Sequence, residues 1–169
     1  MNSVTSVPPF SGGWGHSHGL TDVRPPSIPR GLEQAVDRLL IHEMIAAYCW
    51  SVDEAQYDLM TQILTEDFDF QGCIAGVAPL DHITRAADLV TWLQAWLPTR
   101  CDQLRHSTSN VIVTEQTDTT ADVHAYVTLT SATPEALTPL ATAFYRFWLV
   151  KQDGTWRIAK VFSGFDRAF

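Results

Sequence analysis

Cysteine is scarce in this sequence, and its spacing excludes two common uses of the residue. Cys49, Cys73 and Cys101 are odd in number and form no C-x-x-C pair. Neither a disulfide framework nor a zinc knuckle is therefore expected, and a reducing compartment is the simplest location. The first residues also lack the basic patch and following apolar segment of a secretory signal. We therefore expect a cytoplasmic protein.

Long apolar runs, basic clusters and metal-binding motifs are also missing. No apolar run reaches the roughly 18 to 20 residues of a membrane helix, so no membrane contact is predicted. The 19 acidic residues outnumber the 11 basic ones, and no Lys/Arg cluster interrupts this net charge of −8. Such a surface repels phosphate backbones, which argues against nucleic acid as a partner. Without an H-E-x-x-H spacing or a nucleotide-binding glycine loop, we expect neither a metal nor another cofactor.

The composition itself indicates one folded domain preceded by an arm. Hydrophobic residues make up 46% of the 169 residues and charged residues 18%, as in globular proteins. Residues 1–30 hold five of the nine prolines and four of the nine glycines, which is unsuited to a packed core. We predict a flexible arm or strap there, in which His16 and His18 are incidental rather than metal ligands. Residues 31–169 form the predicted domain.

Apolar residues at helical spacing predict three helices before the C-terminal half. The first helix should span about 32–52, the second about 57–64, and a short strand should then end at Gly72. Asp81 is the expected cap of the third helix, and Pro98 closes it. The first helix is predicted from apolar residues that recur every four positions, namely Val36, Leu40, Met44, Tyr48 and Val52, and that are flanked on the same face by Ile41, Ile45 and Cys49.

The C-terminal half has the composition of long β-strands. Four segments are rich in Val, Thr, Ile and aromatic residues, and the pair Asp153-Gly154 is a strong hairpin signal. Asp122 and His124 share one face of their strand, which we assign to the outer side of the sheet. Helices followed by an antiparallel meander predict an α+β fold with the helices on one face of the sheet.

Four motifs in this order resemble the nuclear transport factor 2-like superfamily, in its SnoaL-like and scytalone-dehydratase-like branch. The motifs are "AAYCWSVD", "LTEDFDF", "RHSTSN" and "FWLVKQDGTWRI", and the resemblance covers about residues 32–166. It implies a cystatin-like α+β barrel: a cone-shaped, curled antiparallel sheet packed around the N-terminal helices, with an apolar cavity open at one end. It also implies a homodimer or higher homo-oligomer that forms through the outer sheet face.

The resemblance also implies a catalytic pair. Asp53 and His106 match an acid/base dyad of the dehydratase-like members. A carboxylate beside a histidine fixes its tautomer and stabilises the imidazolium that forms after proton abstraction. We therefore predict a cofactor-independent cyclase, dehydratase or isomerase for a hydrophobic, oxygenated natural-product intermediate such as a polyketide or terpenoid. The alternative is a non-catalytic module of the same fold that binds a ligand or braces a partner subunit.

Four further residues are candidates for substrate contact. Asn110 follows His106 by four residues, so a regular strand would point both to the same side; its amide would bind a substrate oxygen or satisfy buried backbone. Tyr48 and Tyr145 would offer phenols to the ligand or simply pack in the core. Trp92, one helical turn before Trp96, would line or cover an apolar pocket, although core packing explains an aromatic pair equally well.

Two departures from scytalone dehydratase separate this chain from that enzyme. Its pocket tyrosine before the dyad aspartate is replaced here by Val52, and a second one falls on Gly72. In that enzyme the two phenols hold the water that assists the reaction. We therefore do not expect the same dehydration of the same substrate.

Overall fold

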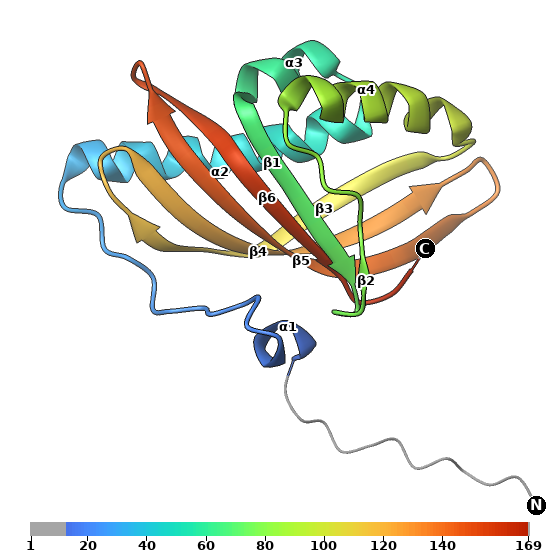
Figure 1. Cartoon of the computed structure of the whole chain (residues 1–169), viewed down its shortest axis with the longest axis horizontal. Helices are drawn as coiled ribbons and strands as arrows, with labels where there is room; N and C mark the ends of the chain where they lie inside the picture. Colours follow the sequence, from blue (N-terminus) through green and yellow to red (C-terminus); the bar gives the residue numbers. More distant parts are fainter. Residues whose placement is uncertain (1–12, 169) are drawn as a thin grey trace, which may run out of the picture.

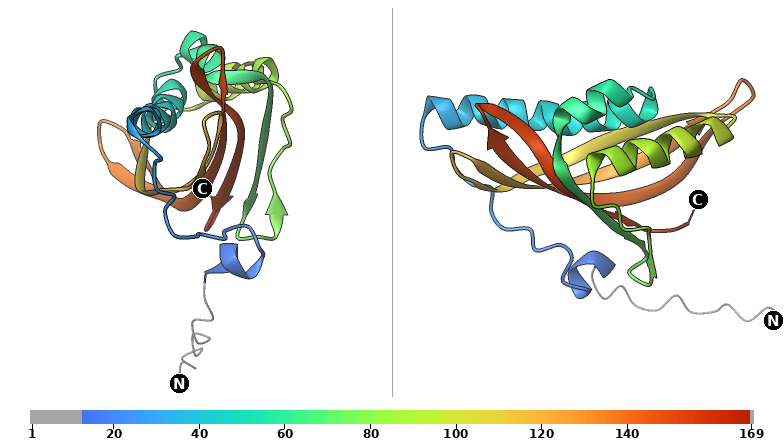
Figure 2. Two further views of the ribbon diagram at one scale, coloured as in Figure 1. Left: turned by 90° about the vertical axis from the view of Figure 1, so that its left-hand side faces the viewer. Right: turned by 45° about the horizontal axis from the view of Figure 1, so that its top comes forward.

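The computed structural model describes residues 13–168 and has the predicted α+β architecture (Figure 1). The elements are α1 (Trp14–Ser17), α2 (Leu32–Asp53), α3 (Tyr57–Ile63), β1 (Leu64–Ile74), β2 (Ala78–Pro79), α4 (Ala86–Trp96), a 3₁₀ turn (Leu97–Thr99), β3 (Gln103–Gln116), β4 (Thr120–Ala132), β5 (Leu137–Gln152) and β6 (Thr155–Phe165). Helices α2, α3 and α4 lie on one side of the sheet, and α1 lies on the other (Figure 2).

The six strands form one curled sheet in the order β2-β1-β6-β5-β4-β3. Strands β3 to β6 form the expected antiparallel meander, and β1 pairs with β6 in parallel, with Phe70 opposite Val161. This parallel pair differs from the purely antiparallel expectation, because β1 enters the sheet beside the last strand and runs in the same direction. In the described part of the chain, β2 and β3 remain the edges, so the sheet does not close into the expected barrel.

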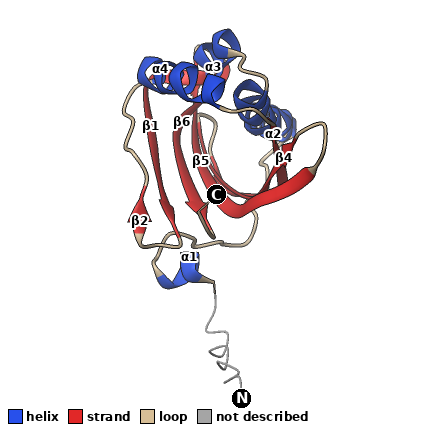
Figure 3. Cartoon of the chain, turned by 90° about the vertical axis from the view of Figure 1, so that its right-hand side faces the viewer, coloured by secondary structure: helices blue, strands red, loops and turns tan. Residues whose placement is uncertain are grey.

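The core lies between α2 and the concave face of the sheet (Figure 3). Among the largest fully buried side chains are Phe68, Phe147 and Trp156. The buried face of α2 includes Ile41 and Ile45, as predicted, together with Tyr48, Cys49 and Val52. The predicted positions Val36 and Leu40 remain 47% and 41% exposed.

A buried ion pair attaches the first half of α2 to the sheet. Asp37 is buried on the helix, and its two carboxylate oxygens lie 2.9 and 3.0 Å from the Lys151 ammonium on β5. The pair holds the Asp37 face of the helix against the sheet. Val36 and Leu40 are directed partly to solvent, which hydrophobic spacing alone did not indicate.

The third helix begins later than predicted, at Ala86 rather than at Asp81, and Arg85 occupies the position that precedes its first turn. The intervening segment is extended because Phe70 and Ile83 exchange backbone hydrogen bonds of 2.7 and 3.1 Å. Likewise, β1 continues past Gly72 to Ile74. Only glycine fits at position 72, since a Cβ there would lie 2.6 Å from the Ser163 carbonyl oxygen.

The described part of the N-terminal arm, residues 13–30, crosses the outer face of the sheet (Figure 1). The Trp14 ring packs against Phe144 of β5, with ring centroids 5.0 Å apart. Farther along, the Ser27 amide donates a hydrogen bond to the Val113 carbonyl of β3. This part of the arm is therefore a strap attached to the sheet at both ends, and residues 1–12 of the predicted arm lie outside the described residues.

We predict that Asp37→Asn destabilises the fold. The substitution leaves the Lys151 ammonium without its carboxylate, and Lys151 retains partial contact with water. We therefore expect the free energy of unfolding, measured by urea denaturation, to fall by about 2 to 3 kcal/mol. Asp67→Asn, at an exposed position of β1, is the matched control and should change it by less than about 0.5 kcal/mol. Equal stability of Asp37→Asn and the wild type would contradict this role of the pair.

Candidate active site

The structure brings Asp53 and His106 together at the concave face. Asp53 is the last residue of α2, and His106 lies near the start of β3. One Asp53 carboxylate oxygen is 2.6 Å from His106 Nδ1, and the other accepts the His106 backbone N–H at 2.7 Å. The two side chains are only 7% and 10% exposed. Because a carboxylate accepts hydrogen bonds, Nδ1 donates to Asp53, and Nε2 is the ring nitrogen that remains for a ligand.

Neighbouring contacts fix the position of this pair. The Gln103 side-chain amide donates to the Asp53 backbone carbonyl at 2.8 Å. Arg105 forms an ion pair with Glu54 at 2.9 Å. The chain can leave α2 abruptly because Ala55 adopts a left-handed conformation, with φ of 51°. The end of α2 and the start of β3 are thus joined by several contacts on either side of the Asp53–His106 hydrogen bond.

His106 faces a cavity of about 360 Å³ that α2, α4 and the inner face of the sheet enclose. Its lining is largely apolar, whereas Asp53 lies behind the imidazole and does not line it. The predicted residues Tyr48, Trp92 and Tyr145 all line this cavity. Its other lining residues are Val52, Phe70, Ile74, Leu80, Asp81, Ile83, Leu89, Leu93, Trp96, Arg100, Leu104, Leu129, Phe165 and Ala168.

The two phenols and the thiol near His106 are held in their neutral forms. Burial raises the pKa of Tyr48 and of Tyr145 well above the usual value of a phenol. Burial, and then the nearby negative charge of Asp53, raises the pKa of the Cys49 thiol to about 12. The Tyr145 ring lies 6.4 Å from the His106 ring, centroid to centroid. Both phenols can therefore donate hydrogen bonds, and neither they nor the thiol acts as an anion near neutral pH.

An aromatic and cationic group stands at the α4 side of the cavity. Trp92 and Trp96 are stacked, with centroids 5.2 Å apart and ring planes 18° apart. The Arg100 guanidinium lies 5.3 Å from the centre of the Trp96 ring and bonds Asp102 through two nitrogens. Hydrogen bonds from Arg100 and Ser131 hold the pKa of Asp102 below its usual value.

Arg100 lines the cavity although it was not among the residues predicted from the sequence. A charged residue just after a helix usually faces water. The only local indication that Arg100 lines the cavity is its position shortly after the Trp92–Trp96 pair and Pro98. The 3₁₀ turn that ends α4 carries the side chain back over Trp96.

The prediction that Asn110 shares a face with His106 is wrong. Asn110 has a left-handed backbone, with φ of 51°, and the pairing of β3 with β4 shifts register between Ser109 and Ile112. This bulge adds one residue to β3, so Ser109 and Asn110 both face the outer side. Asparagine adopts this conformation more readily than most residues, which was the only local signal.

Between positions 13 and 168, no group of three His, Cys, Asp or Glu side chains is placed to hold a metal ion. No helix in that same range has the length and hydrophobicity to cross a membrane.

Comparison with known families gives the same fold. The SnoaL-like domain family matches residues 33–161, which is most of the chain. The chain belongs to the SnoaL-like family. Among curated proteins, none matches the sequence significantly.

Solved structures similar to this SnoaL-like domain have diverse descriptions. A protein of unknown function with a cystatin-like fold from Nostoc punctiforme PCC 73102 is 23% identical, with a TM-score of 0.67 over 78% of this chain and 92% of that one. A candidate scytalone dehydratase from Novosphingobium aromaticivorans is 18% identical, with a TM-score of 0.66 over 79% and 86%. The beta subunit of a candidate aromatic-ring-hydroxylating dioxygenase from the same organism is 15% identical, with a TM-score of 0.67 over 78% and 90%. At these identities, the similarities show that this chain shares its fold with these proteins.

We predict that the buried Cys49 resists alkylation in the folded SnoaL-like domain. With a pKa of about 12, only about one thiol in 10⁴ is ionised at pH 8. Iodoacetamide at that pH should modify the exposed Cys101 and leave Cys49 unmodified, as measured by peptide mass spectrometry. Modification of both at similar rates in the native protein would contradict the burial of Cys49, and a denatured sample, in which both react, is the control.

Proposed function

We propose that this chain is a cofactor-independent acid/base enzyme that cyclises, dehydrates or isomerises a hydrophobic, oxygenated small molecule. The observation that carries the proposal is the 2.6 Å contact between Asp53 and His106 Nδ1, with the imidazole facing an apolar cavity. Withdrawing two polar groups from water costs free energy, which the hydrogen bond between them offsets in part. A functional role of the pair would explain why the fold keeps both groups buried beside the cavity. Membership in the SnoaL-like family supports the general class.

In the proposed mechanism, His106 Nε2 takes a proton from a hydroxyl or an acidic C–H of the substrate. Asp53 stabilises the imidazolium that forms, and the ring then returns the proton to another atom of the substrate or to a leaving hydroxyl. The neutral phenols of Tyr48 and Tyr145 donate hydrogen bonds to a substrate oxygen on which negative charge develops. Acid/base help of this kind accelerates reactions by about 10² to 10⁴-fold.

The cavity indicates the kind of substrate. Its volume of about 360 Å³ lies near the lower end of the range for small-molecule sites, which favours a compact one- or two-ring molecule. The stacked Trp92–Trp96 pair offers a flat apolar surface, and Arg100 next to it offers a cation to a carbonyl or hydroxyl oxygen. A polyketide or terpenoid intermediate has this combination of rings and oxygens.

A second candidate function is a non-catalytic module that binds a ligand or braces a partner subunit. The observation that favours it is the fold shared with a dioxygenase beta subunit. In that case the Asp53–His106 hydrogen bond would serve only to attach α2 to β3. Proton-transfer activity in the cavity distinguishes the two functions.

Proton abstraction can be tested with 5-nitrobenzisoxazole, a compact two-ring molecule. A base removes its ring C–H proton while the N–O bond breaks, which yields a coloured cyanophenolate without any co-reactant. We expect the wild type to accelerate this reaction and His106→Ala to lose about 100-fold of the rate constant kcat/KM. His82→Ala, which removes an exposed histidine, is the matched control and should retain the wild-type rate. A folded His106→Ala variant as active as the wild type would contradict the proposal.

Asp53→Asn tests the second member of the pair. The amide has nearly the same shape but no charge, so it stabilises the imidazolium less, and we expect kcat/KM to fall at least about tenfold. Circular dichroism serves to verify folding, because the substitution also weakens the attachment of α2 to β3. Unchanged kcat/KM in the folded variant would exclude a catalytic contribution of the carboxylate.

A further inference from the structure

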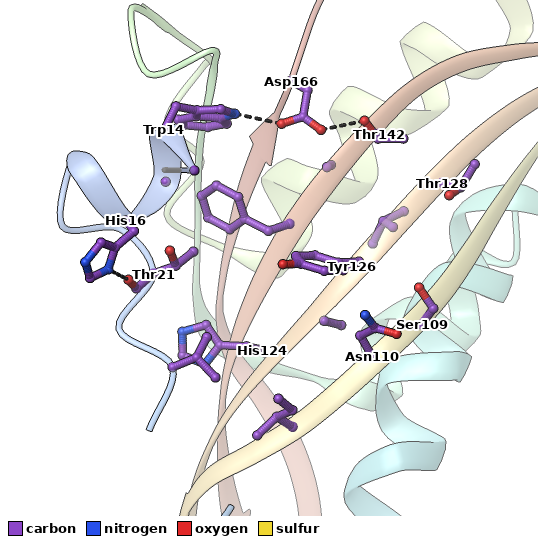
Figure 4. A pocket seen from close by; sticks show the side chains of 18 residues that line it. Trp14, His16, Thr21, Ser109, Asn110, His124, Tyr126, Thr128, Thr142 and Asp166 are labelled. Carbon is purple, nitrogen blue, oxygen red and sulfur yellow. Dashed lines mark hydrogen bonds between the residues drawn. The ribbon is translucent and has the colours of Figure 1, made fainter. Parts of the chain in front are cut away.

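A second cavity, of about 580 Å³, lies between the strap and the outer face of the sheet (Figure 4). His124 and Tyr126 of β4 line it, whereas Leu129 of the same strand lines the His106 cavity. Because successive residues of a strand point to opposite faces, the sheet separates the two cavities. Among the described residues, none lines both of them. We call the outer one the strap cavity.

The strap is firmly seated over this cavity. The Trp14 indole N–H donates to the Asp166 carboxylate at 2.6 Å (Figure 4). The Trp14 ring packs on Phe144. Gly15 permits this approach, since a Cβ there would lie 2.6 Å from the Phe144 ring. Ser27 holds the other end of the strap through its backbone bond to β3. The strap cavity therefore has a roof of its own and is more than a depression of the sheet.

His124 is a buried polar group that the fold itself does not satisfy. The residue is only 5% exposed, and within residues 13–168 neither ring nitrogen has a hydrogen-bond partner. The nearest carboxylate oxygen, on Asp122, is 3.9 Å from Nδ1, beyond hydrogen-bond distance. Asp122 is instead bonded by Arg146 through two nitrogens. Buried polar side chains without partners are rare in proteins, and each calls for an explanation.

The charges around His124 favour an uncharged ligand. Burial lowers the pKa of His124, and Arg146 lowers it further, while Asp122 and Asp22 act in the opposite direction. The ring is therefore neutral near pH 7, with one nitrogen able to donate and the other able to accept. The Asp166 carboxylate at the rim of the cavity disfavours an anionic ligand.

The remaining lining favours an aromatic ring. Trp14, Tyr126 and Phe144 supply aromatic surface. The β3 bulge adds the polar side chains of Ser109 and Asn110 on the same face (Figure 4). Flat apolar walls with a few convergent polar groups are the usual features of a small-molecule site, and the volume lies within the usual range.

We propose that the strap cavity is a second binding site, for a small uncharged aromatic alcohol whose hydroxyl forms a hydrogen bond with the His124 ring. The site is independent of the proposed reaction at His106. Its ligand places an aromatic ring beneath the strap, against Trp14 and Phe144.

The test uses the full chain, labelled with ¹⁵N, and p-cresol as the probe. Spectra of the histidine ring nitrogens should show saturable shifts of the His124 signals on addition of p-cresol, and His106→Phe should leave these shifts unchanged. Toluene has the same ring without the hydroxyl. The affinity for each compound is measured from the shift of the Gly15 backbone amide signal. His124→Phe should weaken the affinity for p-cresol at least about fivefold and change the affinity for toluene less than about twofold.

A pair of strap variants keeps the test independent of His124→Phe folding. Gly15→Val places a side chain into the Phe144 ring, so the roof is displaced and p-cresol binding should weaken at least about fivefold. Ile28→Ala is the control in the same strap, because that side chain is 86% exposed and does not line the cavity. For these variants the affinity is followed at the His124 ring signals.

Three results would overturn the proposal. The first is that p-cresol shifts the His106 signals and not those of His124. The second is an equal p-cresol affinity of the wild type, His124→Phe and Gly15→Val. The third is that the His124 signals follow protein concentration rather than p-cresol, which would assign this face to a contact between two copies of the chain, as the expected homodimer requires.

Discussion

The hydrogen bonds of the Asp53 carboxylate set both the fold and the candidate site. One oxygen holds the backbone of β3 and the other holds the His106 ring. The end of the central helix is thereby attached to the edge strand, and the same carboxylate fixes which nitrogen of the imidazole faces the cavity. A buried carboxylate without such donors would be costly, so the strand cannot shift without exposing or isolating the charge. The contacts that join the helix to the sheet therefore also fix the position of the His106 ring relative to Asp53.

The surroundings of His106 leave its ring as the base that lies beside the neutral phenols of the inner cavity. The phenols and the thiol nearby are protonated because burial disfavours their anions. Asp53 is shielded behind the ring and does not line the cavity. A proton accepted by the imidazole would stay close to a carboxylate in a region of low polarity, where opposite charges attract more strongly than in water. The arrangement suits a reversible proton transfer better than a nucleophilic reaction.

Much of the fold could be predicted from local patterns. Helical spacing located α2 within a residue, the Asp153-Gly154 pair located the last hairpin, and the resemblance to a known family supplied the Asp53–His106 pair. These features depend on residues close in sequence or on a family pattern that already includes distant contacts.

The errors arose where a distant partner decides the local conformation. The pairing of Ile83 with Phe70 keeps the segment before α4 extended, and the ion pair of Asp37 buries a charged residue of α2 while Val36 and Leu40 stay partly exposed. The register of β3 on β4 places Asn110 on the outer face. The spacing of residues along the sequence contains no information about those long-range contacts. The same applies to the strap cavity, since its walls come from both ends of the chain.

The parallel pairing of β1 with β6 has a consequence for how the chain folds. Strands β3 to β6 are joined by short connections, so each hairpin closes with little loss of chain entropy. In contrast, Leu64 must find Ile158 across the whole intervening meander. We expect the meander to assemble early and the β1–β6 seam to close late, at a rate limited by this long loop. The walls of the inner cavity that β1 supplies, including Phe70 and Ile74, would then be the last to form. A ligand of this cavity would therefore bind only after the chain has folded completely.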